Sequence, residues 1–148
     1  MTKIRNASDP EDPGFLSSKS EARNAKQIRM PQGENPKRFD LEDRTFAFAK
    51  HARMFVKKLT KTIGNVEDAR QLVRASGSVG ANYIEANESL SKKDFVLRIK
   101  ICRKEAKESR YWLRLLEAVD QTGVERDVLV QEAQELMNIF GAIMRKSE

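Results

Sequence analysis

Residues 91–116 read SKKDFVLRIKICRKEAKESRYWLRLL, and this stretch decides the fold. Apolar or small residues recur every three or four positions along it, which is the period of an amphipathic α-helix. Ser91 and Asp94 have the Ser-x-x-Asp form of a capping box, so we expect the helix to begin there and to run to about Asp120. The predicted core stripe consists of Phe95, Ile99, Cys102, Ala106, Ser109, Leu113 and Leu116.

The same period extends toward the N-terminus and predicts two more helices, over residues 40–63 and about 66–90. Gly64 is expected to end the first of them, and Asn65 to cap the second. The inward positions of the first are Leu41, Thr45, Phe48, Ala52, Phe55, Leu59 and Ile63. Those of the second are Leu72, Ser76, Val79, Tyr83, Ala86 and Leu90.

A fourth helix is predicted from about Glu125, after a break at Gly123. Its inward positions are Leu129, Ala133, Leu136, Phe140 and Ile143. Four long helices joined by short connections favour an all-α fold, an up-down-up-down antiparallel four-helix bundle over residues 40–148.

Residues 1–39 differ from this pattern, because they hold all four prolines and few apolar side chains. We expect a disordered leader there. The 148 residues contain a single cysteine and no apolar run of 18 residues, and the N-terminus lacks the apolar segment of a secretory signal. These features predict a cytoplasmic protein that is not inserted in a membrane.

No set of residues in the sequence suggests catalysis. His51 is the only histidine, and Cys102, the only cysteine, falls on an inward stripe, so neither a zinc cluster nor an exposed thiol is expected. A di-iron bundle would need Glu-x-x-His pairs, which are absent. The sequence therefore predicts no enzyme activity, no metal and no cofactor.

Basic residues concentrate on the helix predicted from Lys92. Between Lys92 and Arg114 there are nine Lys/Arg and three acids, a surplus that equals the net charge of +6 of the whole chain. At about 100° per residue, one side of this helix gathers a basic strip about 20 Å long. The strip consists of Lys100, Arg103, Lys104, Lys107, Arg110 and Arg114, with Arg70, Lys92 and Lys93 nearby. It predicts either contact with nucleic acid or another polyanion, or a solvated helix face.

The other side of the same helix carries a second apolar stripe, made of Leu97, Ile101, Trp112 and Leu115. A surface helix of a monomer needs only one such stripe. The second stripe favours self-association, with a broad core within one chain as the alternative.

The helix over residues 66–90 has two further features. Small residues at 76–81, SGSVGA, would let a neighbouring helix approach closely or would kink the helix. Its polar side suggests a network centred on Arg74 and Glu85 that reaches the next helix. The predicted members are Arg74, Ser78, Asn82, Glu85, Glu105 and Glu108, with ordinary surface salt bridges as the alternative for the carboxylates.

Two motifs in these helices are similar to those of a known family. One is Arg-x-Ser-x-Ser-x-x-x-Asn-x-x-Glu-Ala, which begins at Arg74, and the other joins Asp94-Phe95 to the Lys-Glu-x-x-Glu-Ser of residues 104–109. Over about residues 39–145 the chain resembles the bacterial four-helix bundle proteins labelled 23S ribosomal RNA intervening-sequence proteins.

This resemblance implies a left-handed bundle that assembles as a ring-like homopentamer without known enzymatic activity. Some members are encoded within insertions in ribosomal RNA genes. The similar accessory proteins of diversity-generating retroelements are associated with nucleic acid and a reverse transcriptase.

Two functions from different classes follow. The first is a homo-oligomeric bundle that binds RNA or DNA through phosphate contacts, since no groove-reading motif is present. The second is an interaction or scaffold module whose basic face docks an acidic protein.

Overall fold

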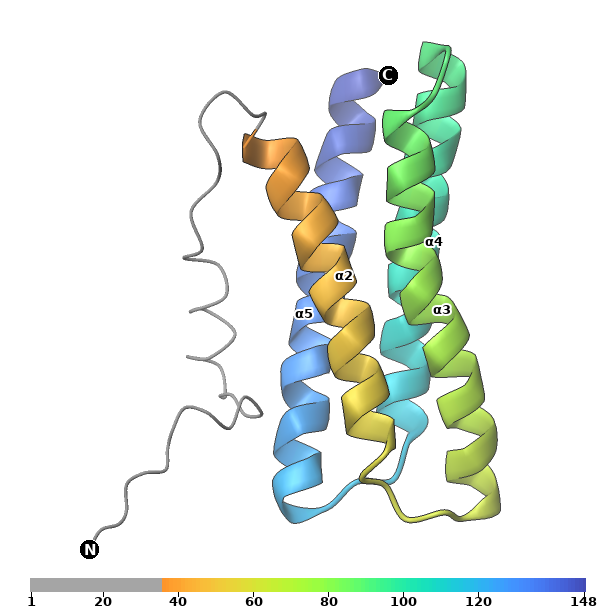
Figure 1. The fold of residues 1–148 in the computed structure, drawn as a ribbon, viewed down its shortest axis with the longest axis vertical. Helices are drawn as coiled ribbons and strands as arrows, with labels where there is room; N and C mark the ends of the chain where they lie inside the picture. The colour runs from red at the N-terminus through yellow and green to blue at the C-terminus, as the bar shows by residue number, and fades with distance from the viewer. Residues whose placement is uncertain (1–35) are drawn as a thin grey trace, which may run out of the picture. The chain divides into compact units, whose positions relative to one another are not determined.

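The computed structural model describes residues 36–148, with side chains from Leu41 onward. Its helices are α2 (Pro36–Val56), α3 (Ile63–Asn87), α4 (Lys92–Leu115) and α5 (Asp120–Ser147), and this part of the chain contains no strand. Leu41–Glu148 form one compact unit in which successive helices run in opposite directions (Figure 1). The predicted up-down-up-down four-helix bundle is therefore confirmed. The leader predicted for residues 1–39 lies outside the described residues, except for its last four, which begin α2.

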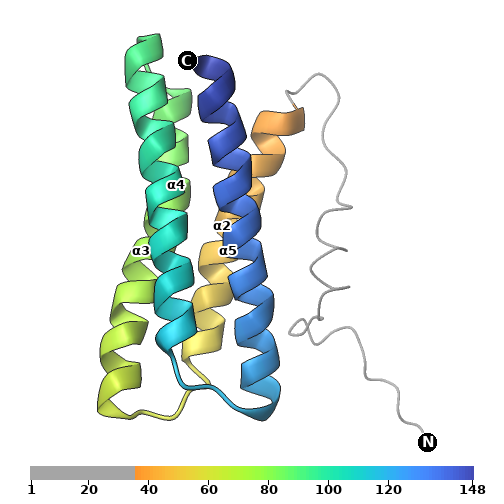
Figure 2. The same cartoon turned by 180° about the vertical axis from the view of Figure 1, so that it is seen from behind.

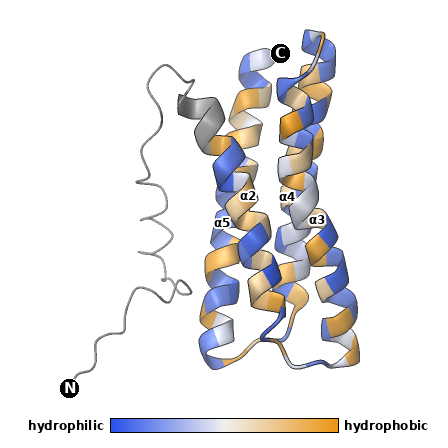
Figure 3. Cartoon of the chain, in the orientation of Figure 1, coloured by the Kyte–Doolittle hydropathy of each residue, from blue (hydrophilic) through white to orange (hydrophobic). Residues whose placement is uncertain are grey.

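The core of the bundle is built from the predicted stripes. Hydrophobic and hydrophilic residues intermingle along all four helices (Figure 3), and the large side chains that are almost completely buried include Phe48, Leu72, Ile99 and Phe140, one from each helix. Burying a side chain of this size contributes about 1.5–3 kcal/mol. The inward stripes therefore supply the main free energy that holds the four helices together.

Two predicted core positions are wrong. Ile63 is 87% exposed and Leu90 is fully exposed, because each lies where a helix begins or has already ended. The first helix ends at Val56 instead of Ile63, and Ile63 and Gly64 instead form the first turn of α3. The cap of α3 is Thr62, whose hydroxyl accepts a hydrogen bond from the amide of Asn65 at 3.0 Å.

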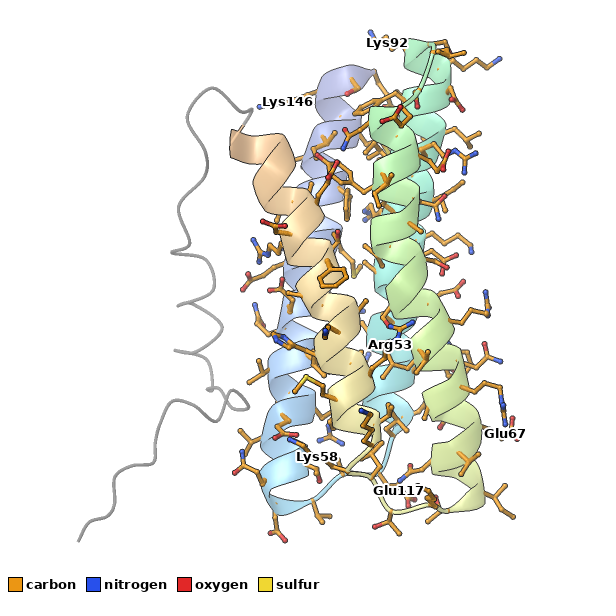
Figure 4. All side chains as sticks on the ribbon, in the orientation of Figure 1. Arg53, Lys58, Glu67, Lys92, Glu117 and Lys146 are labelled. Carbon is orange, nitrogen blue, oxygen red and sulfur yellow. The ribbon has the colours of Figure 1, made fainter. Side chains whose placement is uncertain are left out.

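Asn65, which was predicted to be that cap, joins two connections at the same end of the bundle. Its side chain is buried and donates to the carbonyl oxygens of Thr60 and Glu117 at 3.0 and 3.1 Å. Its Oδ1 atom accepts from the amide of Glu117 at 2.9 Å. One amide thus fixes the connection between α2 and α3 against the connection between α4 and α5, where Figure 4 labels Lys58 and Glu117.

The ends of α4 and α5 differ in how well the sequence predicts them. Ser91 caps α4 as expected and accepts from the amide of Asp94 at 3.0 Å. However, α4 ends at Leu115, and α5 already begins at Asp120, so Gly123 lies inside its first turn and is not a break. The Thr122 hydroxyl accepts a hydrogen bond from the amide of Val119 and donates one to its carbonyl oxygen. These bonds stabilise the first turn of α5, so the helix begins before Gly123.

The small residues of α3 allow one close approach to α2. A Cβ atom on Gly80 would lie 2.9 Å from the hydroxyl oxygen of Thr45. Thr45 is buried, and its hydroxyl donates to the carbonyl oxygen of Leu41. The prediction that small side chains admit a neighbouring helix is confirmed at this position.

Candidate nucleic-acid interface on α4 and α5

The predicted basic strip lies on the side of α4 next to α5, since Lys100, Arg103 and Arg110 approach Glu148, Gly141 and Gln134. The two helices run side by side in Figures 1 and 2. Five of its six residues are exposed, and the sixth, Arg110, is half-buried. The contacts of the six side chains divide them into those engaged within the chain and those available to a ligand.

Two lysines of the strip are paired with carboxylates. Lys104 Nζ lies 3.2 Å from Glu108 Oε2 and 3.5 Å from Glu105 Oε2. The hydrogen bond to Glu108 and the charges of both carboxylates raise the pKa of Lys104. Lys100 Nζ lies 3.6 Å from the side chain of Glu148. These two positive charges are therefore partly neutralised by the protein itself.

Arg110 connects α4 to α5. Its Nη1 atom donates to the side-chain oxygen of Gln134, and its buried Nε atom has no hydrogen-bond partner among the described residues. The Arg110 guanidinium therefore adds positive potential to the surface, but it does not project into solvent where a ligand could contact it.

Arg103, Lys107 and Arg114 are exposed and form no ion pair with any residue that the structure describes. A fourth cation joins them from α5. A Cβ atom on Gly141 would lie 3.3 Å from Arg103 Nε and 3.4 Å from Arg145 Nη1, so both guanidinium groups approach the same glycine. We call Arg103, Lys107, Arg114 and Arg145 the basic ridge. Arg145 was not predicted from the sequence, because a basic residue in the last turn of a helix is also what the helix dipole favours.

The arrangement of acids on α5 explains why none of them, within the described chain, pairs with the basic ridge. Arg44 of α2 forms ion pairs with Glu132 (Nε to Oε2, 2.7 Å) and with Glu135 (Nη2 to Oε1, 2.6 Å). Lys58 forms an ion pair with Glu125 (Nζ to Oε2, 2.8 Å). Glu132 and Glu135 therefore face α2, and Glu125 faces the connection that follows it. The side of α5 that contacts α4 presents Gln134, Gly141 and Arg145 instead.

The three supplementary basic residues lie apart from the basic ridge. Lys92 and Lys93 line a hollow of about 810 Å³ at the N-terminal end of α4, together with Lys100 and Glu148, and Figure 4 labels Lys92 at that end. Arg70 is exposed on α3. The structure therefore groups Lys92 and Lys93 with Lys100 but places Arg70 on a different helix.

The second apolar stripe is partly buried within the bundle. Trp112 is half-buried and packs against the core, so only part of its side chain is left for an external interface. Leu97 and Leu115 remain 54% and 47% exposed, and Ile101 is half-buried. Two exposed leucines about 27 Å apart along α4, with Ile101 between them, are left as apolar surface.

The predicted polar network has a different centre. Arg98 of α4 donates to Asn82 Oδ1 of α3 at 3.1 Å, and Asn82 donates to the carbonyl oxygen of Ser78 at 2.9 Å. Arg74 and Glu85 are both exposed and form no ion pair with each other or with the carboxylates of α4. Glu105 is buried, and its Oε1 atom has no hydrogen-bond partner among the described residues.

The single cysteine and the single histidine lie on different helices, Cys102 on α4 and His51 on α2. Cys102 is fully buried, and burial raises the pKa of its thiol to about 12. Desolvation lowers the pKa of His51 on α2, against the opposing charge of Glu132. Within the described part of the chain there is no cluster of three or more His, Cys, Asp or Glu residues suited to a metal ion. None of the helices described there has the length and apolar character needed to cross a membrane.

Comparisons with known proteins agree with this architecture. The family model described as 23S rRNA-intervening sequence protein matches residues 37–142. Among solved structures, the chain is similar to a protein of unknown function from the S23 ribosomal protein family of Bacteroides thetaiotaomicron. The two are 26% identical, the match covers 74% of this chain and 98% of the other, and the TM-score is 0.64. No match is found among curated proteins.

Proposed function

The chain belongs to the 23S rRNA-intervening sequence protein family, and from that premise we propose that it is a non-enzymatic homo-oligomer that binds nucleic acid through the basic ridge. The stoichiometry that the family resemblance implies is a pentamer. Binding would use the phosphate backbone, since α4 contacts the rest of the bundle along its length and offers no separate recognition element for a groove.

The observation that carries the proposal is that the basic ridge has no acidic partner among the residues that the structure describes. Arg103, Lys107, Arg114 and Arg145 form no ion pair with the described residues. The nearby acids of α5 are instead bound to Arg44 of α2 and to Lys58, which follows α2. Polyanions bind such a surface by releasing counterions. Four phosphate contacts would give a log–log salt slope of about −3.6 on duplex DNA.

Self-association is supported by the exposed leucines. Leu97 and Leu115 lie on a side of α4 that faces neither α5 nor the core, and burial against a second copy would remove them from water. Each copy would then contribute one basic ridge, and several ridges on one assembly would strengthen binding to a long polyanion.

The test is a triple charge reversal of Arg103→Glu, Lys107→Glu and Arg114→Glu. The matched control is Lys50→Glu, Lys57→Glu and Lys61→Glu, which makes the same change in net charge at exposed positions outside α4 and α5. We expect the first variant to lose at least about a hundredfold in affinity for RNA or DNA at 100 mM salt, and the control to lose far less. Equal losses in the two variants would show that net charge alone, and not the basic ridge, drives binding.

The same basic ridge would also fit an acidic protein surface, which is the alternative function. Affinity that falls with salt is expected for both partners, but competition by RNA or DNA is expected only for the first. A wild-type protein that binds neither nucleic acid at low salt would favour the protein partner.

A further inference from the structure

Tyr111 lies on the outer side of α4 among the cations of the basic ridge. We propose that the ridge takes single-stranded nucleic acid in preference to duplex, with one base stacked on the ring of Tyr111. This inference rests on the proposed function and specifies its ligand.

The first observation is the exposure of this tyrosine. Tyr111 is 56% exposed, whereas Tyr83, the other tyrosine in the chain, is 5% exposed and packs near Phe140. The Tyr111 hydroxyl has no hydrogen-bond partner among the described residues. The ring therefore contributes little to the core and is open to solvent.

The second observation is its position relative to the cations. Tyr111 follows Lys107 by four residues and precedes Arg114 by three, and residues at these spacings are neighbours on a helix surface. Both neighbours are exposed and lack acidic partners within the described chain. An aromatic ring between two free cations can stack on a base while the cations bind its flanking phosphates.

The third observation is that the ring is already oriented. Tyr111 and Trp112 lie edge to face, with ring centroids 5.0 Å apart and an interplanar angle of 77°. Trp112 packs against the core and so holds the tyrosine from one side. An ordered ring loses less conformational freedom when a ligand binds than a mobile one does.

These features favour a single strand because only unpaired bases expose their faces. In a duplex both faces of every internal base are covered by its neighbours, so Tyr111 could contact only the backbone. Stacking one base on an aromatic side chain strengthens binding by about five- to 150-fold. The ridge from Arg103 to Arg114 spans about 16 Å, which suits a short stretch of backbone.

The experiment compares Tyr111→Ala and Tyr111→Phe with the wild type. The ligands are a 12-nucleotide oligouridine and a 12-base-pair RNA duplex, and the variants are checked by thermal unfolding. Phe46→Ala is the matched control, because Phe46 is also exposed (66%) but lies on α2 with Lys50 over its ring. Trp112 is the only tryptophan and adjoins Tyr111, so its fluorescence reports a base that stacks there.

We expect the wild type to bind the single strand at least tenfold more tightly than the duplex, with a change in Trp112 fluorescence. Tyr111→Ala should lose about tenfold for the single strand only, whereas Tyr111→Phe and Phe46→Ala should bind as the wild type does. Equal affinity for both ligands, or a Tyr111→Ala variant that is unchanged, would overturn this inference and leave the basic ridge as a backbone-binding site. A change of oligomeric mass in Tyr111→Ala would assign the ring to a subunit interface instead. Wild-type protein that binds neither ligand would overturn the proposed function itself.

Discussion

The environment of Cys102 determines its chemistry. The thiol is fully buried on the inner side of α4, and burial raises its pKa to about 12, well above the ordinary value of a cysteine. Because the reactive form of cysteine is the thiolate, the folded protein holds this residue in an unreactive state.

We therefore expect Cys102 to resist thiol reagents at pH 8.5 and to react fully in urea. Above about pH 9 the unfolded chain releases the thiol proton while the folded chain retains it, so stability should decline as the pH rises from about 9 toward 12. Titration with a chromogenic disulfide, together with urea unfolding at pH 8 and pH 10, measures both effects. The Cys102→Ala variant should lack this part of the decline. Rapid labelling without denaturant would contradict the buried placement.

At the residue scale, the sequence predicts which side chains are buried better than it predicts their partners. Asn65 was identified as a cap because Asn favours that position, yet its hydrogen bonds reach Glu117, 52 residues away. Lys100, Lys104 and Arg110 were correctly placed on one side of α4, but their engagement by Glu148, Glu108 and Gln134 depends on rotamers and on a neighbouring helix. A helical period contains no such information.

At the element scale, two glycines in helix interiors have opposite surroundings. Gly80 of α3 meets the branched, buried side chain of Thr45 on α2, whereas Gly141 of α5 meets only the flexible ends of Arg103 and Arg145. Replacing either glycine by alanine would favour the helix by about 1 kcal/mol. Whether the protein as a whole becomes more stable depends on whether the neighbouring atoms can make room for the added Cβ atom.

We expect Gly141→Ala to raise the free energy of unfolding by roughly 0.5–1 kcal/mol, because the two arginine tips can move by a few tenths of an ångström. Gly80→Ala should lower it by about 1–3 kcal/mol, since Thr45 cannot yield without losing its own hydrogen bonds. Urea unfolding of both variants beside the wild type measures the difference. If both changes stabilised the protein, the close approach of α2 and α3 would have to be looser than described.

The helices themselves were predictable in number, order and inward stripe, because one period runs through each of them. Their ends were predictable only where a local signal decides, as with Ser91. The start of α3 depends on Thr62, and that of α5 on Thr122, while the nearby residues Gly64 and Gly123 are accommodated inside first turns. Glycine alone was therefore a misleading signal for a helix end.

At the scale of the whole molecule, charge is segregated between the two sides of α5. Glu132 and Glu135 bind Arg44 of α2, and Glu125 binds Lys58 just after α2. The other side of α5 adds Arg145 to the cations of α4. The side of α4 that carries Leu97 and Leu115 is different again, since it combines exposed apolar surface with the carboxylate of Glu108. The basic ridge and the exposed leucines thus lie on different sides of α4, with Tyr111, four residues before Leu115, at the boundary between them.

This separation predicts that assembly and binding can be uncoupled. The double variant Leu97→Glu, Leu115→Glu should fall from an oligomer to a monomer in light scattering coupled to size exclusion, because buried carboxylates without partners oppose association. Its helical content should be unchanged, since both leucines are largely exposed. The charge-reversed ridge variant should keep the oligomeric mass. A wild-type protein that elutes as a monomer at all concentrations would contradict the assembly.

The bridge made by Asn65 links the dynamics of two segments that are distant in the sequence. The amide of Glu117 lies beyond the last residue of α4, where backbone amides ordinarily exchange with solvent quickly, yet it donates to Asn65 Oδ1. Neither connection at that end of the bundle can open without releasing the other. In native-state hydrogen exchange the two connections should therefore behave as one cooperative unit, with protection at Glu117 closer to that of the helices than to that of a loop.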